Sequence, residues 1–103
     1  MTKHPVIIEV LDLLKTSNTP VIKVYKDNAN IKILVIGMLK GVKMKKYKSN
    51  NKASILIKTG KVNYKSITTN KIFNIQDEHF IPAEELHAVE ALDNSFILLT
   101  TSK

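Results

Sequence analysis

The chain has 103 residues, 44% of them hydrophobic, which suits one globular domain with a single core and argues against disorder. It contains no cysteine, so disulfide bonds and thiolate metal sites are excluded. The formal net charge is +7, and all sixteen basic residues are lysines. Because arginine is the residue suited to bidentate contacts with phosphates and bases, this composition argues against a nucleic-acid partner.

The sequence also bears on the compartment. No stretch approaches the roughly 18 apolar residues that a membrane span needs. The first residues lack the charged region, apolar run and small-residue cleavage site of a signal peptide. We therefore expect a cytoplasmic protein with no membrane partner, and the absence of cysteine agrees with a reducing compartment.

One helix is predicted, over about residues 5–16. Its apolar residues recur at helical spacing and comprise Val6, Ile7, Val10, Leu13 and Leu14. Pro5 suits a first helical turn, and the Asn-Thr-Pro sequence at residues 18–20 ends the helix. We expect this helix to pack on the outside of the domain or to join a partner chain.

The rest of the chain, from about residue 20 to 102, has the pattern of short β-strands separated by turn residues. The run from Ile31 to Leu39 is apolar almost throughout, which is typical of a strand buried on both faces. No second helical pattern follows, so an all-β sandwich or barrel is predicted. The expected strands are 21–26, 31–39, 42–48, 53–58, 61–68, 71–75, 80–81, 86–91 and 96–101.

Two groups of residues carry a more specific signal. Gly41 and Gly60 stand nineteen positions apart, and Pro82 precedes His87 by five positions, ahead of an acidic turn and an apolar final strand. This spacing resembles the two-part signature of the cupin barrel. The resemblance covers about residues 30–103. It implies a double-stranded β-helix, a jelly-roll barrel, which here forms one domain over residues 1–103 with the helix in front.

The contents of the signature differ from its usual pattern. In metal-binding cupins, two His and one Glu of the first motif join a His of the second motif around one metal. The matching positions here are Tyr47, Ser49, Ala53 and His87, so only His87 is a conventional ligand. Because a catalytic zinc or iron site needs about three protein ligands, we expect no metal and no cofactor.

Neither remaining histidine is expected to replace the missing ligands. His79 lies eight residues before His87, across a loop, and His4 lies near the terminus. Neither has the short spacing that places two imidazoles side by side. His79 is predicted to be a surface or half-buried strand residue.

The strand near residue 45 presents a conflict of register. If Tyr47 and Ser49 face the barrel interior, strict alternation also turns Lys45 inward and the apolar Met44 outward. A bulge near residues 45–46 would correct the register. Alternatively, Met44 packs under another element, such as the N-terminal helix. The sequence leaves both solutions open.

These observations predict a non-catalytic, cupin-like protein that binds a small polar or anionic ligand in its barrel. Tyr47, Ser49 and His87 would donate or accept hydrogen bonds at the mouth, and Lys45 would supply charge. Because similar small cupins are often homodimers, the resemblance also implies a homodimer.

Two other classes stay open. The first is an enzyme, either metal-dependent through non-standard ligands or a metal-free isomerase with Tyr47 and His87 as its acid/base pair. Such an enzyme should retain a metal or bring these two side chains within one water of each other. The second is a structural or regulatory interaction domain, which predicts a closed interior filled with Ile and Leu.

Overall fold

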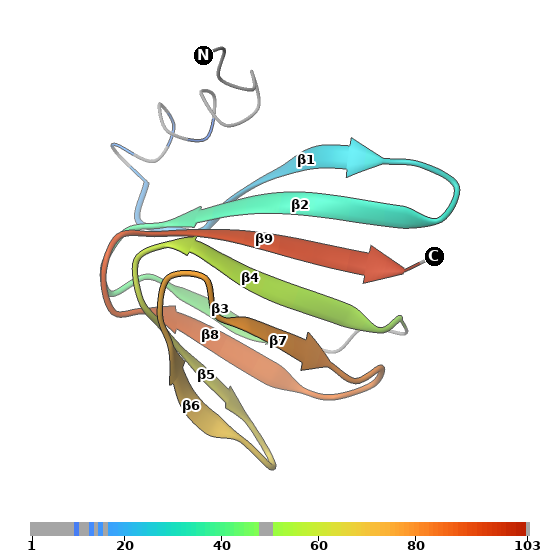
Figure 1. The fold of residues 1–103 in the computed structure, drawn as a ribbon. Helices are drawn as coiled ribbons and strands as arrows, with labels where there is room; N and C mark the ends of the chain where they lie inside the picture. The colour runs from blue at the N-terminus through green and yellow to red at the C-terminus, as the bar shows by residue number, and fades with distance from the viewer. Residues whose placement is uncertain (1–9, 11–12, 14, 16, 48–50, 103) are drawn as a thin grey trace.

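The computed structural model describes residues 10, 13, 15, 17–47 and 51–102, with residues 45–47 described by their backbone alone (Figure 1). The helix predicted over residues 5–16 lies largely outside the described residues. Among those described, no helix is long and apolar enough to cross a membrane. The strands are β1 (Val21–Asp27), β2 (Ile31–Met38), β3 (Lys43–Tyr47), β4 (Ala53–Thr59), β5 (Val62–Ser66), β6 (Asn70–Phe73), β7 (Glu78–Ile81), β8 (His87–Ala91) and β9 (Ser95–Ser102).

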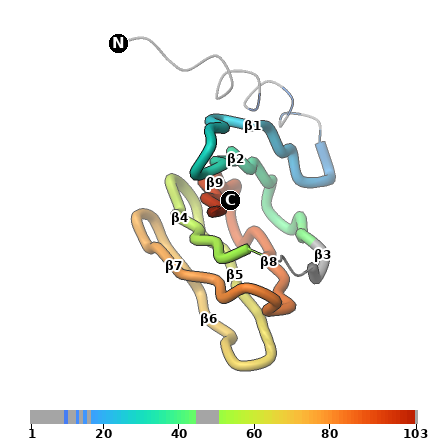
Figure 2. Tube along the Cα trace, turned by 90° about the vertical axis from the view of Figure 1, so that its right-hand side faces the viewer, coloured from blue at the N-terminus to red at the C-terminus, as the bar shows by residue number. Residues whose placement is uncertain are grey.

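The strands form two antiparallel sheets that face each other (Figures 1 and 2). One sheet has five strands in the order β1-β2-β9-β4-β7, and the other has four in the order β3-β8-β5-β6. Neighbouring strands are often distant in sequence, as where β9 lies between β2 and β4. This arrangement confirms the predicted all-β jelly-roll architecture.

The core lies between the two sheets because alternate side chains of each strand point inward. In β9, the buried positions Ser95, Ile97 and Leu99 alternate with half-buried ones. β2 is buried on both faces over its second half, from Val35 to Met38, as the apolar run predicted. The core contains Ile36, Met38, Val42, Met44, Ile55, Ile57, Val62, Tyr64, Phe73, Ile81, Val89, Ala91, Ile97 and Leu99.

The core is incompletely closed beside β1. Ile22 and Val24 stand opposite Ile36 and Leu34 in the register of β1 with β2, so all four share the inner face. Ile36 is 1% exposed, whereas Ile22 and Val24 are 48% and 46% exposed. The sheet that contains β1 has one strand more than the sheet opposite. The inner face of β1 is therefore left partly uncovered.

A bulge resolves the conflict of register in β3. Met44 pairs with Val89 and Tyr47 pairs with His87, so two residues of β3 stand opposite the single Ala88 of β8. The bulge shifts the register of β3 between Met44, which packs in the core, and Tyr47. The first of the two solutions left open by the sequence is correct.

The backbone conformation agrees with the positions of glycine in the two-part signature. Among the described residues, positive φ angles occur at Gly41 (88°), Gly60 (91°), Gln76 (71°) and Glu84 (68°). These are the four positions at which the signature has glycine. Left-handed backbone favours glycine because a Cβ atom is crowded there. Left-handed backbone therefore occurs at all four of these positions, two of which hold Gln76 and Glu84 in place of glycine.

Candidate functional site

Two of the predicted site residues, Tyr47 and His87, pair through their backbones at the end of β3 and the start of β8. Lys45 belongs to the bulge of β3. Ser49 and His4 lie outside the described residues. The ligand contacts predicted for Tyr47, Ser49, His87 and Lys45 stay predictions.

His87 is held firmly in the barrel interior. Its side chain is 3% exposed, and its ring stacks on the Tyr64 ring with centroids 5.6 Å apart and planes inclined by 23°. Its Nδ1 atom lies 3.1 Å from the backbone carbonyl oxygen of Glu85. Because a carbonyl oxygen only accepts hydrogen bonds, Nδ1 carries a proton and donates it in this contact.

Tyr64 joins His87 to the β7–β8 loop. It follows Val62 on the inner face of β5 and is fully buried. A buried hydroxyl needs a hydrogen-bond partner, and the Tyr64 hydroxyl donates to Glu85 Oε1 over 3.0 Å. The side chain of Glu85 therefore contacts Tyr64, and its backbone carbonyl contacts His87. These two contacts hold the β7–β8 loop at the end of the barrel.

His79 completes this cluster, and the sequence interpretation missed its position. It is half-buried, as predicted, but it pairs with Ile55 and faces the interior. Its ring centroid lies 4.6 Å from that of Tyr64 and 5.1 Å from that of Phe73. The available signal was the buried Ile81 two positions later, because residues two apart in a strand share a face.

The surroundings of His79 favour its neutral form. Burial lowers the pKa of the imidazole below its usual value, since burial penalises the charged state. Glu85 raises the pKa of His79, and Lys71 and His87 lower it. His79 and His87 are therefore close enough to interact electrostatically, although they are eight positions apart in the sequence.

The cluster does not provide a metal site among the described residues. No three side chains of His, Cys, Asp or Glu lie together there in a way that could hold one ion. Ala53, at the position where the signature has Glu, offers no donor atom. The described arrangement can therefore exchange protons and hydrogen bonds, but it lacks the ligands that a first-row metal requires.

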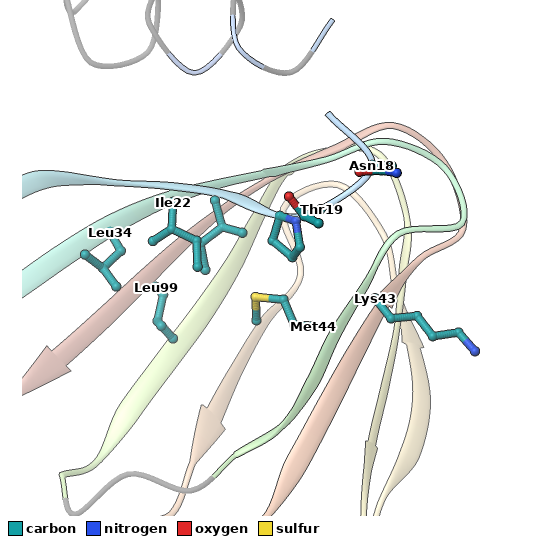
Figure 3. A pocket seen from close by; sticks show the side chains of 9 residues that line it. Asn18, Thr19, Ile22, Leu34, Lys43, Met44 and Leu99 are labelled. Atoms are coloured by element: carbon teal, nitrogen blue, oxygen red, sulfur yellow. The ribbon is translucent and has the colours of Figure 1, made fainter. Parts of the chain in front are cut away.

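A cleft opens between the two sheets beside β1 and β3 (Figure 3). Its volume is about 630 Å³, within the range of small-molecule sites. Met44 lines it, three residues before Tyr47 in β3. The cleft therefore lies beside the strand that contains Lys45 and Tyr47, two of the predicted site residues. Its lining residues are Asn18, Thr19, Pro20, Ile22, Leu34, Ile36, Lys43, Met44 and Leu99.

Comparison with known proteins identifies the fold. No protein-family model matches the chain, and no curated protein matches it. Solved structures do. An RmlC-like cupin from Desulfovibrio desulfuricans superposes with a TM-score of 0.78 at 15% identity, over 99% of this chain and 96% of that chain. A conserved protein of unknown function from Streptococcus pyogenes superposes with a TM-score of 0.78 at 16% identity, over 99% of this chain and 90% of that chain.

A third similar structure is KdgF from Halomonas sp., with a TM-score of 0.78 at 11% identity, over 84% of this chain and 82% of that chain. At such identities the likeness concerns the fold alone. Together with the two facing antiparallel sheets, it shows that the chain has the cupin fold, as the spacing of its signature predicted.

Proposed function

We propose that this protein binds a small molecule inside its cupin barrel and does so without a metal. The observation that carries the proposal is the cleft of about 630 Å³ between the sheets. It is concave and mostly apolar, which is how small-molecule sites are usually built. The ligand's body would lie in the cleft, against these apolar side chains.

The open cleft weighs against the interaction-domain alternative, which predicted a closed interior. A barrel with a purely structural role would be expected to bury Ile22 as fully as it buries Ile36, which stands opposite it. The partial exposure of Ile22, which lines the cleft, supports a site that is completed by a ligand.

A metal-free acid/base enzyme is a second candidate. The specific observation in its favour is the direct pairing of Tyr47 with His87, beside the cluster of Tyr64, Glu85 and His79. Two imidazoles, two phenols and a carboxylate are groups that move protons. Isomerisation by proton transfer is the reaction class that these groups suit.

Replacing Ile22 by tryptophan is expected to abolish ligand-induced stabilisation. Ile22 lines the cleft and is half exposed, so the larger ring can fill the cleft without disrupting the core. A ligand at 100 times its dissociation constant stabilises a protein by about 2.7 kcal/mol, which raises the melting temperature by several degrees. The measurement is the melting temperature with and without each compound of a small-molecule panel.

Val24→Trp is the matched control. Val24 lies on the same face of the same strand with nearly the same exposure, but it does not line the cleft. It should keep the ligand-induced rise in melting temperature. Equal responses of the two variants would contradict the proposed location of the site.

A further inference from the structure

We infer that the ligand of the cleft is an amphipathic anion, an aliphatic chain that carries one carboxylate group. This inference rests on the proposed function and names its ligand class. The negative charge agrees with the small polar or anionic ligand expected from the sequence, whereas the aliphatic body departs from that expectation, because apolar side chains line the cleft.

The lining defines the body of the ligand. Ile22, Leu34, Ile36, Met44 and Leu99 come from four strands of both sheets and present only hydrocarbon and thioether surface (Figure 3). A sugar or another polyol placed against these side chains would lose hydrogen bonds to water without replacing them. An aliphatic chain loses none and gains the hydrophobic effect of burial.

The size of the cleft suits a small molecule. Its volume of about 630 Å³ lies within the range of small-molecule sites. Ile36 and Leu99 line it and are otherwise buried in the core, so a ligand that contacts them reaches into the space between the two sheets.

Charge at the entrance defines the head group. Among the described residues of the lining, Lys43 is the one that carries a charge, and none is acidic. Figure 3 shows the Lys43 side chain directed away from the apolar lining residues, so its ammonium group can meet only a head group that lies at the rim of the cleft. Glu90 pairs with Lys43 across β3 and β8, and its negative charge offsets part of the positive charge of Lys43. The contribution of Lys43 is therefore modest, as for an exposed ion pair.

The test is a set of dissociation constants for hexanoate, octanoate and decanoate below their micellar concentrations. Burial of one methylene group is worth about 0.8 kcal/mol, so each step of two carbons should tighten binding by about tenfold or more. Octanamide, which is neutral, should bind about two- to fivefold more weakly than octanoate. Glucose should not bind.

Two substitutions test the head group. Lys43→Gln should remove the preference for octanoate over octanamide. Lys65→Gln makes the same change of charge on the exposed side of β5, outside the lining of the cleft, and should leave the preference intact. If octanoate and octanamide bind equally to the unaltered protein, the anionic head group is overturned.

Other outcomes separate the inference from the proposed function. Suppose that glucose or citrate stabilises the unaltered protein but not Ile22→Trp, and that the affinity for carboxylates does not depend on chain length. The proposed site is then supported, and the proposed ligand class is overturned. If every effective compound acts equally on Ile22→Trp and Val24→Trp, the proposed function fails. If a second copy of the chain covers the cleft, sedimentation will show a dimer and none of the carboxylates will bind. That result overturns the inference.

Discussion

Gly60→Ala is expected to lower the free energy of unfolding by about 3 to 4 kcal/mol, from steric overlap added to backbone strain. Gly60 has a φ angle of 91°. A Cβ atom there would lie 2.7 Å from Cα of Ser95 and closer still to the carbonyl oxygen of Asn94. Both contacts are with backbone, which cannot move aside as a side chain can. Chemical denaturation followed by circular dichroism measures the loss.

Gly41→Ala is the matched control for this prediction. Gly41 has nearly the same φ angle, 88°, but nothing lies within 4 Å of the Cβ position. Only the cost of the left-handed backbone applies, about 1 to 2 kcal/mol. Equal losses for the two variants would show that the turn at Gly60 does not pack against the β8–β9 connection as described.

Tyr64→Ala is the second substitution with a large expected effect. It removes a fully buried ring that contacts His79, His87 and Phe73. Truncation of a buried aromatic side chain costs about 3 to 5 kcal/mol. Tyr64→Phe keeps the ring and loses the hydrogen bond to Glu85, which should cost about 1 to 2 kcal/mol. Denaturation midpoints measure both losses.

Glu85→Gln provides the control for the hydrogen bond. The amide oxygen of glutamine can still accept from the Tyr64 hydroxyl, so this variant should lose less stability than Tyr64→Phe. A larger loss for Glu85→Gln would mean that the charge of Glu85, rather than its contact with Tyr64, stabilises the loop.

The sequence allowed most of the fold to be predicted because the turns and the alternation are local signals. The Gly41 and Gly60 spacing, the Pro82 loop and the apolar final strand together indicated the jelly roll. The bulge in β3 was one of two solutions to a conflict visible in the sequence itself. Strand β7 was predicted too short, since Glu78 and His79 have the polarity of a loop, whereas the strand begins at Glu78.

The site was predicted less completely because it depends on contacts across the sheets. His79 was set aside on the ground of its sequence spacing, yet the register of β7 with β4 places it against the ring of Tyr64, on which His87 also stacks. Tyr64 itself was not singled out. The sequence predicted a ligand site in the barrel but not a cleft beside β1, because the position of the cleft depends on the order of the strands in the two sheets.

The most direct test of binding inside the barrel is a titration followed by methyl NMR of ¹³C-labelled methionine. The chain has three methionines. Met44 lines the cleft, and Met38 is fully buried in the core without lining it. Binding in the cleft predicts that octanoate shifts the Met44 signal in a saturable way and leaves the Met38 signal in place. A ligand that stabilises the protein while the Met44 signal stays unchanged would contradict the account.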